Sequence, residues 1–506
     1  MTHTTMLDAF HTQVSERPDA VLFDLPDGRR ISYAQTREIV QRVASTLREA
    51  GVVRGDRVAV QVEKSPEAIA LYLAVLQRGA VFLPLNTAYT GAELDYFIDD
   101  ARPRVLVCDP SAATDHAHRA QGDQLVVETL GTTGDGSLLE GSDRDADAEP
   151  VDASDPAAIL YTSGTTGRSK GAVLTHANLT SNAQALVEEW RFTGEDRLIH
   201  ALPIFHVHGL FVAVNMTLMT GATLLYLPRF DADRVIDLLP RASVLMGVPT
   251  FYTRLLEHPE LTAERCAHMR LFVSGSAPLL ARDHEAFAER TGHAILERYG
   301  MTETGMNASN PYVGQRKPGT VGPPLPGVEI KVADGETGAE LPVGEVGSVE
   351  VRGPNVFSGY WQMPEKTASE FREDGFFITG DLGSLDEQGY LSISGRTKDL
   401  VISGGLNVYP KEIEILLDEH PQVLESAVIG VPHPDFGETL VAVVVPASGE
   451  QPEEGAVREF LSGRLAKFKQ PRAVRVVDAL PRNVMGKVQK AELRTRYADL
   501  FVGTDG

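Results

Sequence analysis

The densest group of residues suited to phosphate chemistry lies at positions 161–171, with the sequence YTSGTTGRSKG. Its glycines let the backbone turn tightly and direct N–H groups at an anion, and its hydroxyls add further donors. The lysine, Lys170, follows Gly167 by three residues, so the segment differs from the P-loop pattern G-x4-G-K-[ST]. The residues expected to contact phosphates here are Thr162, Ser163, Gly164, Thr165, Thr166, Gly167 and Lys170.

Six further motifs combine glycines with groups that bind nucleotides or metals. They are FHVHG at 205–209, SGSAP at 274–278, ERYGMTET at 297–304, TGD at 379–381, GRTKDLVISGG at 395–405 and PRNVMGK at 481–487. The two histidines of FHVHG, His206 and His208, raise the alternative of a metal site. No further ligand cluster accompanies them, so a metal site is the weaker hypothesis.

In type and order, these motifs resemble the signature of the adenylate-forming superfamily, which includes acyl-CoA synthetases, firefly luciferases and nonribosomal-peptide adenylation domains. The resemblance extends over nearly the whole chain. It implies an enzyme that joins a carboxylic acid to AMP and then transfers the acyl group to CoA. ATP, CoA and Mg²⁺ are therefore the expected co-substrates and cofactor.

The same resemblance assigns roles around the nucleotide. Gly275 would let adenine lie close to the backbone, Tyr299 would stack on it, and Thr302 would touch the α-phosphate. Glu303 would hold Mg²⁺, a hard cation that favours carboxylate oxygens, and Asp381 would accept the ribose hydroxyls. The residues expected to bind ATP or AMP outside the phosphate loop are Gly275, Ser276, Ala277, Glu297, Arg298, Tyr299, Gly300, Asp381, Arg396 and Lys487.

The C-terminal motifs imply a catalytic lysine and a hinge. Lys487 would bridge the acid carboxylate and the α-phosphate, which otherwise repel each other, and Lys398 occupies the hinge position, where rotation lets one small domain serve both half-reactions. Residues 456–497 hold eleven Lys or Arg and three Asp or Glu. The residues expected to contact CoA are Gly404, Gly405, Arg464, Lys467, Lys469 and Arg472.

Several segments are similar to those of malonyl-CoA synthetases, and this resemblance implies malonate as the acid, with some use of methylmalonate. By resemblance, Arg254 and His206 would hold the distal carboxylate and Ser276 would assist. Arg254 is expected to be buried with a partner, because an unpaired buried charge is costly. Gly305 departs from the bulkier residue of relatives, and we expect this to enlarge the acyl pocket slightly. Another short-chain or dicarboxylic acid–CoA ligase remains the alternative.

The elements that must position these residues alternate along the chain. Apolar runs at 57–62, 104–108, 157–161, 244–248 and 271–273 predict strands, and 66–77 and 179–190 predict helices. Residues 132–156 predict a solvated acidic loop, and Gly, Pro and short strands follow residue 320. We expect an α/β fold: a large domain at 1–397, with two α/β layered subdomains and a β-barrel-like subdomain, and a small mobile α+β domain at 398–506.

Composition restricts the partners. The 506 residues carry a formal net charge of −23, which argues against nonspecific binding to nucleic acid or anionic membranes. Two cysteines, no signal-peptide pattern and no long apolar run predict a cytoplasmic protein without a stable membrane association. A lysine acetyltransferase acting on Lys487 is a further expected partner. The alternatives are a peptide-synthetase adenylation domain, disfavoured because 19 residues follow Lys487, and a nucleotide-binding pseudoenzyme.

Overall fold

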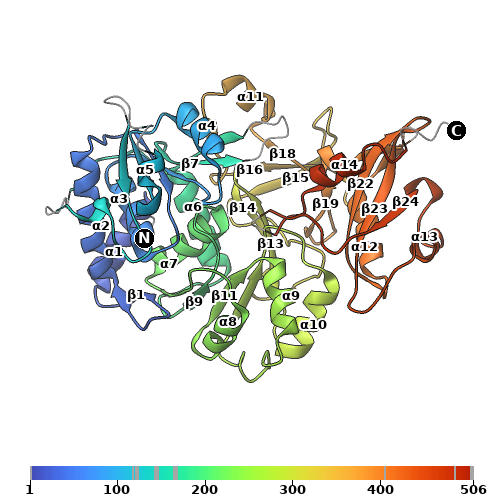
Figure 1. The fold of residues 1–506 in the computed structure, drawn as a ribbon, viewed down its shortest axis with the longest axis horizontal. Helices are drawn as coiled ribbons and strands as arrows, with labels where there is room; N and C mark the ends of the chain where they lie inside the picture. Colours follow the sequence, from blue (N-terminus) through green and yellow to red (C-terminus); the bar gives the residue numbers. More distant parts are fainter. Residues whose placement is uncertain are drawn as a thin grey trace.

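The computed structural model of the chain describes residues 3–116, 119, 125–141, 147–162, 169–403, 406–483 and 486–501. Figure 1 follows the chain from an N-terminal group of sheets and helices to a separate C-terminal lobe that holds α12 to α14. The arrangement confirms the predicted α/β fold with a large N-terminal and a small C-terminal part.

The first sheet is parallel at its centre, where β3 pairs with both β4 and β5. Its strands in spatial order are β17 (Gly359–Tyr360), β8 (Lys170–Thr175), β7 (Pro156–Thr162), β4 (Val81–Pro84), β3 (Arg57–Gln61), β5 (Val105–Cys108) and β6 (Val126–Thr129). The predicted strands at 57–62, 104–108 and 157–161 are therefore confirmed.

The second sheet is parallel from β10 through β9, β11 and β12 to β13. Its strands in spatial order are β14 (Gly305–Ser309), β13 (Leu296–Met301), β12 (Leu271–Ser274), β11 (Val244–Gly247), β9 (Arg197–His200), β10 (Thr223–Tyr226), β1 (Val21–Asp24) and β2 (Arg30–Ser32). Both strands predicted in this part of the chain, 244–248 and 271–273, are confirmed.

Helices cover both faces of these sheets, as the continuous apolar strands require. One core joins the two sheets through α1 (Met6–Glu16), α2 (Tyr33–Glu49), α3 (Pro66–Gln77), α6 (His176–Glu189), the π-helix η4 (His208–Val214) and α7 (Asn215–Thr220). The opposite faces pack against α4 (Gly91–Ala101) on the first sheet and α8 (Ala232–Leu238), α9 (Pro249–Glu257) and α10 (Ala281–Thr291) on the second. Successive residues serve different cores: Leu224 faces the shared core and Leu225 the outer one, because side chains alternate along a strand.

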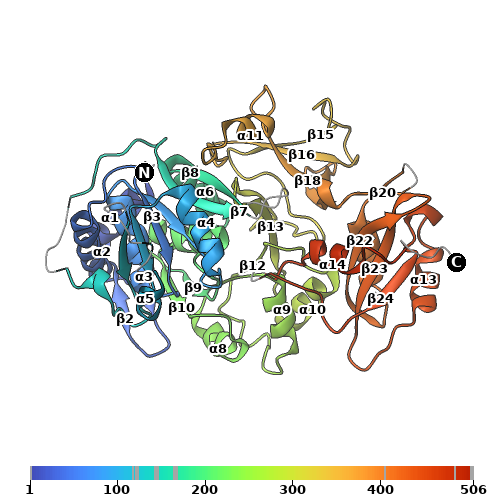
Figure 2. The same cartoon turned by 45° about the horizontal axis from the view of Figure 1, so that its top comes forward.

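The segment after residue 320 forms the expected β-rich part. It is an antiparallel sheet of β15 (Glu329–Ala333), β16 (Gly347–Arg352), β18 (Phe377–Leu385) and β19 (Leu391–Arg396), with α11 (Pro364–Ser369) nearby. Figure 2 shows this sheet between the N-terminal layers and the C-terminal lobe. The short helices elsewhere in the chain are α5 (Ala113–His116), η1 (Pro110–Ala112), η3 (Ser137–Leu139), η5 (Leu239–Arg241), η6 (Thr397–Asp399) and η7 (Lys467–Lys469).

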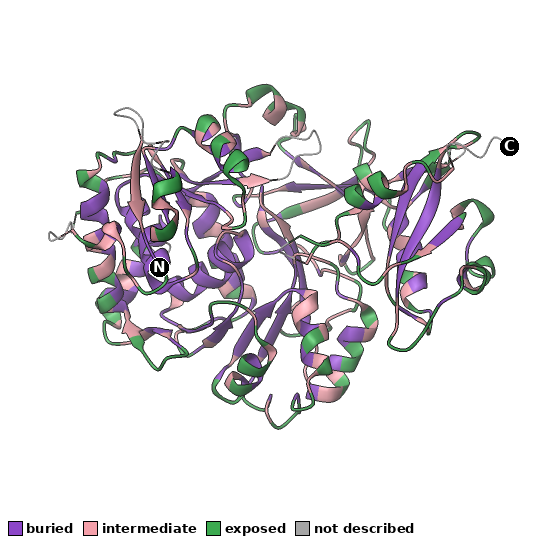
Figure 3. Ribbon diagram, viewed as in Figure 1, coloured by how far each residue is buried: buried purple, intermediate pink, exposed green. Residues whose placement is uncertain are grey.

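The C-terminal lobe has its own sheet and its own cores. The strands are β21 (Leu406–Val408), β20 (Val401–Ser403), β23 (Gly437–Pro446), β22 (Val423–His433) and β24 (Ala473–Val476), with helices α12 (Pro410–Asp418), α13 (Glu454–Ser462) and α14 (Lys490–Tyr497). Figure 3 shows the buried β22 and β23 at its centre. Among the described residues, none of the helices has the length and apolar character that crossing a membrane requires.

Candidate active site

The predicted nucleotide residues gather where the parallel strands of the second sheet end. β12 ends at Ser274, whose register partner on β13 is Glu297, and the SGSAP loop follows. The turn between β13 and β14 carries Thr302 and Glu303. Carboxyl ends of neighbouring parallel strands meet at one edge of a sheet, which is where α/β proteins bind ligands. This edge therefore collects residues from two distant motifs.

Asp381 on β18 is held from two sides. The phenol of Tyr299 donates a 2.6 Å hydrogen bond to Oδ2, and the guanidinium Nε of Arg396 lies 2.7 Å from Oδ1. Asp381 and Arg396 are directly opposite each other in the β18–β19 ladder, which fixes their pairing. The Asp381 carboxylate raises the pKa of Arg396, so the guanidinium stays charged. Two motifs that are far apart in sequence thus form one polar cluster at the predicted ribose position.

Glu303 is buried and is oriented by Tyr360, whose phenol donates a 3.1 Å hydrogen bond to Oε1. Burial raises the pKa of the Glu303 carboxyl. The ammonium of Lys170 lies 4.1 Å from the centre of the Tyr360 ring and 3.7 Å from Oε1 of Glu370. A single carboxylate beside a phosphate loop fits Mg²⁺, which takes one or two carboxylates together with substrate phosphates and water. The described residues contain no cluster of three acidic, His or Cys side chains that could hold a metal on its own.

The phosphate loop is described only at its two ends. Thr162 ends β7, Lys170 begins β8, and the two residues are antiparallel partners. The predicted phosphate contacts that lie outside the described residues are Ser163, Gly164, Thr165, Thr166 and Gly167.

Arg298 is the residue whose environment differs most from the sequence-based expectation. Its side chain is 4% exposed, and its Nε and Nη2 atoms find no hydrogen-bond partner among the described residues. Burial lowers the pKa of the guanidinium to about 9. A Cβ atom at Gly275 would lie 2.4 Å from Cζ of Arg298, so glycine is needed where the guanidinium crosses the SGSAP loop. Gly275 therefore leaves room for the guanidinium of Arg298, in addition to its expected role of letting adenine approach the backbone.

Two polar side chains border the same region. Ser276 has a positive φ of 72°, which is uncommon for a residue other than glycine, and its Oγ lies 3.4 Å from Nδ1 of His208. Burial lowers the pKa of His208 well below its usual value, with Arg298 contributing, so the imidazole is neutral. Its Nε2 is buried without a partner among the described residues. Burial likewise lowers the pKa of His206 to about 4.

Arg254 does not occupy the expected buried position. It lies in the last turn of α9, and its side chain is exposed. The sequence-based prediction of a buried Arg254 is wrong because the helix turns that residue outward, whereas Tyr252 and Leu255 face the core. Its role in holding a carboxylate stays a prediction. The sequence-based expectation placed Arg298 at the nucleotide and did not assign it to the distal carboxylate. Side chains alternate along a strand, so Arg298 lies on the opposite face of β13 from its neighbours Glu297 and Tyr299.

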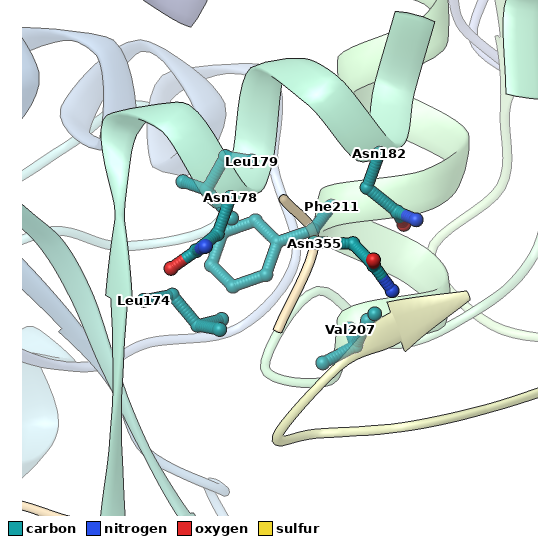
Figure 4. Close-up of a pocket in the computed structure, with 8 residues that line it drawn as sticks. Leu174, Asn178, Leu179, Asn182, Val207, Phe211 and Asn355 are labelled. Atoms are coloured by element: carbon teal, nitrogen blue, oxygen red, sulfur yellow. The ribbon is translucent and has the colours of Figure 1, made fainter. Parts of the chain in front are cut away.

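Gly305 lines a small cavity beside this region, shown in Figure 4. The cavity measures about 10 Å³, which is about the room for one water molecule. Gly305 has φ +59°, and a Cβ atom there would lie 2.6 Å from Oδ1 of Asn182. The expected enlargement of the acyl pocket by Gly305 therefore stays a prediction, since Asn182 occupies the space on that side. The lining residues are Leu174, Asn178, Leu179, Asn182, Val207, Phe211, Gly305 and Asn355.

Lys487 follows Gly486 in the lysine loop of the C-terminal domain. Its side chain is exposed, yet partial desolvation and the nearby Arg396 lower its pKa, whereas Asp381 raises it. A Cβ atom at the preceding Gly486 would lie 3.4 Å from Thr250 on α9. The lysine loop therefore lies against the N-terminal domain and brings the ammonium within electrostatic range of the Asp381 cluster.

Comparison with known proteins decides the family. A model described as AMP-binding enzyme matches residues 10–361, and one described as AMP-binding enzyme C-terminal domain matches residues 412–487. The chain belongs to this family. A feruloyl-CoA synthase from Amycolatopsis sp is 38% identical over 93% of this chain and 94% of its own length, and a mitochondrial malonate–CoA ligase from Mus musculus is 37% identical over 88% and 82%.

A solved structure also resembles the chain over both of its domains. ATP-bound MatB from Rhodopseudomonas palustris is 58% identical over 98% of this chain and 99% of its own, with a TM-score of 0.95. The apo form of MatB, 57% identical over 98% and 99%, gives a TM-score of 0.85. The two domains therefore lie more nearly as they do in the ATP-bound form.

The candidate CoA residues of this AMP-binding enzyme are spread over the C-terminal domain. Gly404 and Gly405 lie outside the described residues. Arg464 and Lys469 already pair with acidic side chains, at 3.4 Å from Glu419 and 2.8 Å from Glu412. Lys467 and Arg472 have no acidic partner among the described residues, and Arg472 lies 4.2 Å from the ring centre of Phe436. These two cations remain the freer candidates for a phosphate.

Proposed function

We propose that this chain is an ATP-dependent malonate–CoA ligase, which converts malonate, ATP and CoA into malonyl-CoA, AMP and pyrophosphate. The observation that carries the choice of acid is the buried guanidinium of Arg298, which has unpaired nitrogens beside Ser276 and His208. The malonate–CoA ligases among its relatives support the same reaction.

Arg298 favours a diacid for an electrostatic reason. A buried cation without a partner is costly, and a carboxylate that enters the pocket removes that cost. The planar guanidinium can donate two parallel hydrogen bonds to the distal carboxylate of malonate. The neutral His208 and the Ser276 hydroxyl add donors, and Arg254 with His206 form the second, sequence-based group for the same carboxylate. Acetate or propionate would leave Arg298 unpaired.

The nucleotide would bind across the edge of the second sheet. We assign the ribose hydroxyls to Asp381, the α-phosphate to Thr302, and the β- and γ-phosphates to residues 162–170. The expected Mg²⁺ would be held by Glu303 and would offset the negative charge of the phosphates. The adenine wall comprises Gly275, Ser276, Ala277, Glu297, Tyr299 and Gly300.

The chemistry needs no covalent acyl-enzyme. In the first step, a carboxylate oxygen of malonate attacks the α-phosphorus and pyrophosphate leaves, while Lys487 offsets the charge between the two anions. In the second step, the CoA thiolate attacks the acyl carbon and AMP leaves. The free cysteines Cys108 and Cys266 are both buried, and burial raises their thiol pKa values to about 11, so neither is suited to be a nucleophile.

We further propose that the domains 1–397 and 398–506 turn about Lys398 between the two steps. Lys398 lies in η6, directly after β19 and before β20, and no residue of η6 is buried. The turn would bring Gly404, Gly405 and the basic residues Arg464, Lys467, Lys469 and Arg472 towards CoA. A lysine acetyltransferase that neutralises Lys487 would stop the first step, and a cytoplasmic location fits the reduced, buried cysteines.

A panel of acids tests the proposal. AMP release would be followed with and without CoA for malonate, methylmalonate, acetate, propionate and ferulate. We expect malonate to be the best substrate and methylmalonate to follow within roughly 10- to 200-fold, because one methyl group discriminates by only about 1–3 kcal/mol. Acetate and propionate should be poor. Preference for ferulate would assign the chain to the activity of its feruloyl-CoA synthase relatives, and no AMP from any acid would refute ligase activity.

A further inference from the structure

Arg282 reaches from the N-terminal domain into the C-terminal domain. It lies at the start of α10, and its Nη1 donates to the backbone carbonyls of Val423 at 3.2 Å and Asp418 at 3.4 Å. Its Nη2 donates to the carbonyl of Leu424. One guanidinium therefore holds three carbonyls of the other domain.

These carbonyls are suitable acceptors for a cation. Asp418 is the last residue of α12, and the final carbonyls of a helix lack intrahelical partners and carry the negative end of its dipole. Val423 and Leu424 begin β22, a long strand that pairs along its whole length with β23, the central strand of the C-terminal sheet. The planar fork of arginine can meet several acceptors at once, which a lysine ammonium does less well.

A chain of contacts runs from this point to the catalytic lysine. Glu425, next to Leu424, forms an ion pair with Arg482 at the start of the lysine loop. The same guanidinium donates to the carbonyl of Gly486, the residue before Lys487. The strand that Arg282 holds therefore also holds the loop that carries Lys487.

The N-terminal side of this contact is equally connected. Asp283, beside Arg282, accepts a 2.9 Å hydrogen bond from Thr253 on α9, and Thr250 on the same helix lies against Gly486. Helices α9 and α10 thus contact the C-terminal domain at two separated points, at the end of α12 and at the lysine loop. Two such points fix an orientation that one hinge could not.

We propose that Arg282 is a positioning residue for Lys487, which sets the C-terminal domain in the orientation that the first half-reaction needs. The proposal rests on the proposed function. Arg282 itself touches no substrate and acts by holding β22, and through Glu425 and Arg482 the lysine loop. Loss of Arg282 should therefore slow adenylation without weakening substrate binding.

The test separates the two half-reactions. For Arg282→Ala, we expect kcat of malonate-dependent ATP–pyrophosphate exchange to fall roughly 10- to 100-fold, because misplacement of a catalytic group by about 1 Å costs that much. KM for ATP and malonate should change less than about twofold, and so should thioester formation from supplied malonyl-AMP and CoA. Arg282→Lys should recover part of the rate. Unchanged exchange, or an equal loss in both half-reactions, would overturn the proposal.

Two comparisons exclude a merely structural effect. Arg265→Ala removes an arginine from the same domain whose partner, Glu260, lies in that domain too, and should leave both half-reactions unchanged. The double variant Arg282→Ala/Lys487→Ala should form thioester from supplied malonyl-AMP and CoA as fast as Lys487→Ala does, and a further loss in that step would overturn the proposal. If the wild-type enzyme shows no exchange with malonate, it is the proposed function that fails, and the comparison is repeated with the acid that the wild-type enzyme does use.

Discussion

The phenol of Tyr299 and the carboxylate of Asp381 are 2.6 Å apart, although they come from two different sheets of the N-terminal domain. With Arg396 on the other carboxylate oxygen, this contact holds Asp381 rigidly at the edge where the nucleotide is expected. Orientation of a single acceptor carboxylate is what recognition of two neighbouring hydroxyls requires.

Removal of either partner of this pair should weaken nucleotide binding by different amounts. Tyr299→Phe deletes one hydrogen bond to a charged group, so we expect the Kd for AMP to rise roughly tenfold. Asp381→Ala deletes the acceptor and leaves Arg396 unpaired, so the rise should be larger, roughly 100-fold. Calorimetric titration with AMP measures both. Equal and negligible effects would show that this cluster does not hold the ribose.

Arg298 should decide the choice of acid. Arg298→Met should lower kcat/KM for malonate by about 3–5 kcal/mol, which is roughly a hundred- to several thousand-fold. Without substrate, the same change removes a buried unpaired cation, so the melting temperature should be unchanged or higher. In this variant, kcat/KM for malonate would therefore fall, whereas the melting temperature would stay the same or rise.

The exposed Arg254 provides the matched comparison for Arg298. If Arg298 is the receptor of the distal carboxylate, Arg254→Ala should change kcat/KM for malonate less than Arg298→Met does. A larger effect of Arg254→Ala would support the sequence-based role of Arg254. Equal, small effects would show that neither arginine holds the distal carboxylate.

Lys487 should act in the first half-reaction alone and only when charged. Lys487→Ala should abolish adenylation and leave thioester formation from malonyl-AMP largely intact. Because desolvation and Arg396 lower the pKa of Lys487, the adenylation rate should fall with rising pH already below the ordinary lysine value of 10.5. A pH profile of exchange between about pH 6 and 10 measures this limb. Any activity that remains in Lys487→Arg should not show this fall at high pH. If the fall persists in that variant, the titrating group is not Lys487.

Glu297 should make stability depend on pH. Burial raises its pKa from 4.5 to about 7, so the unfolded chain loses this proton at lower pH than the folded one. The contribution of Glu297 to stability therefore falls as pH rises from 4.5 to about 7 and is constant above that. Glu297→Gln removes this loss, worth up to about 3 kcal/mol. By urea unfolding, the free energy of unfolding of Glu297→Gln should exceed that of the wild type at about pH 8 but not at about pH 4. The same difference at both pH values would show that titration of Glu297 is not its cause.

Some of the site could be predicted from sequence because it depends on local chemistry. The strand at 157–161, the loop after it and Lys170 form one continuous segment, and its residue types suffice to indicate a phosphate site. The position of Arg298 could not be predicted in this way. Its neighbours Glu297 and Tyr299 suggested a nucleotide contact, and only the pleat of β13 against Gly275 turned its side chain away from them.

The sequence by itself determined the family, the order of the α/β elements and the reaction class, because motif residues and hydrophobic periodicity are written along the chain. The tertiary structure alone decided which arginine is buried and how the C-terminal domain is held. Arg254 and Arg298 are equally plausible cations in the sequence, yet α9 turns one to solvent and β13 encloses the other. Burial, and the contact of Arg282 with carbonyls about 140 residues away, arise only when distant segments pack together.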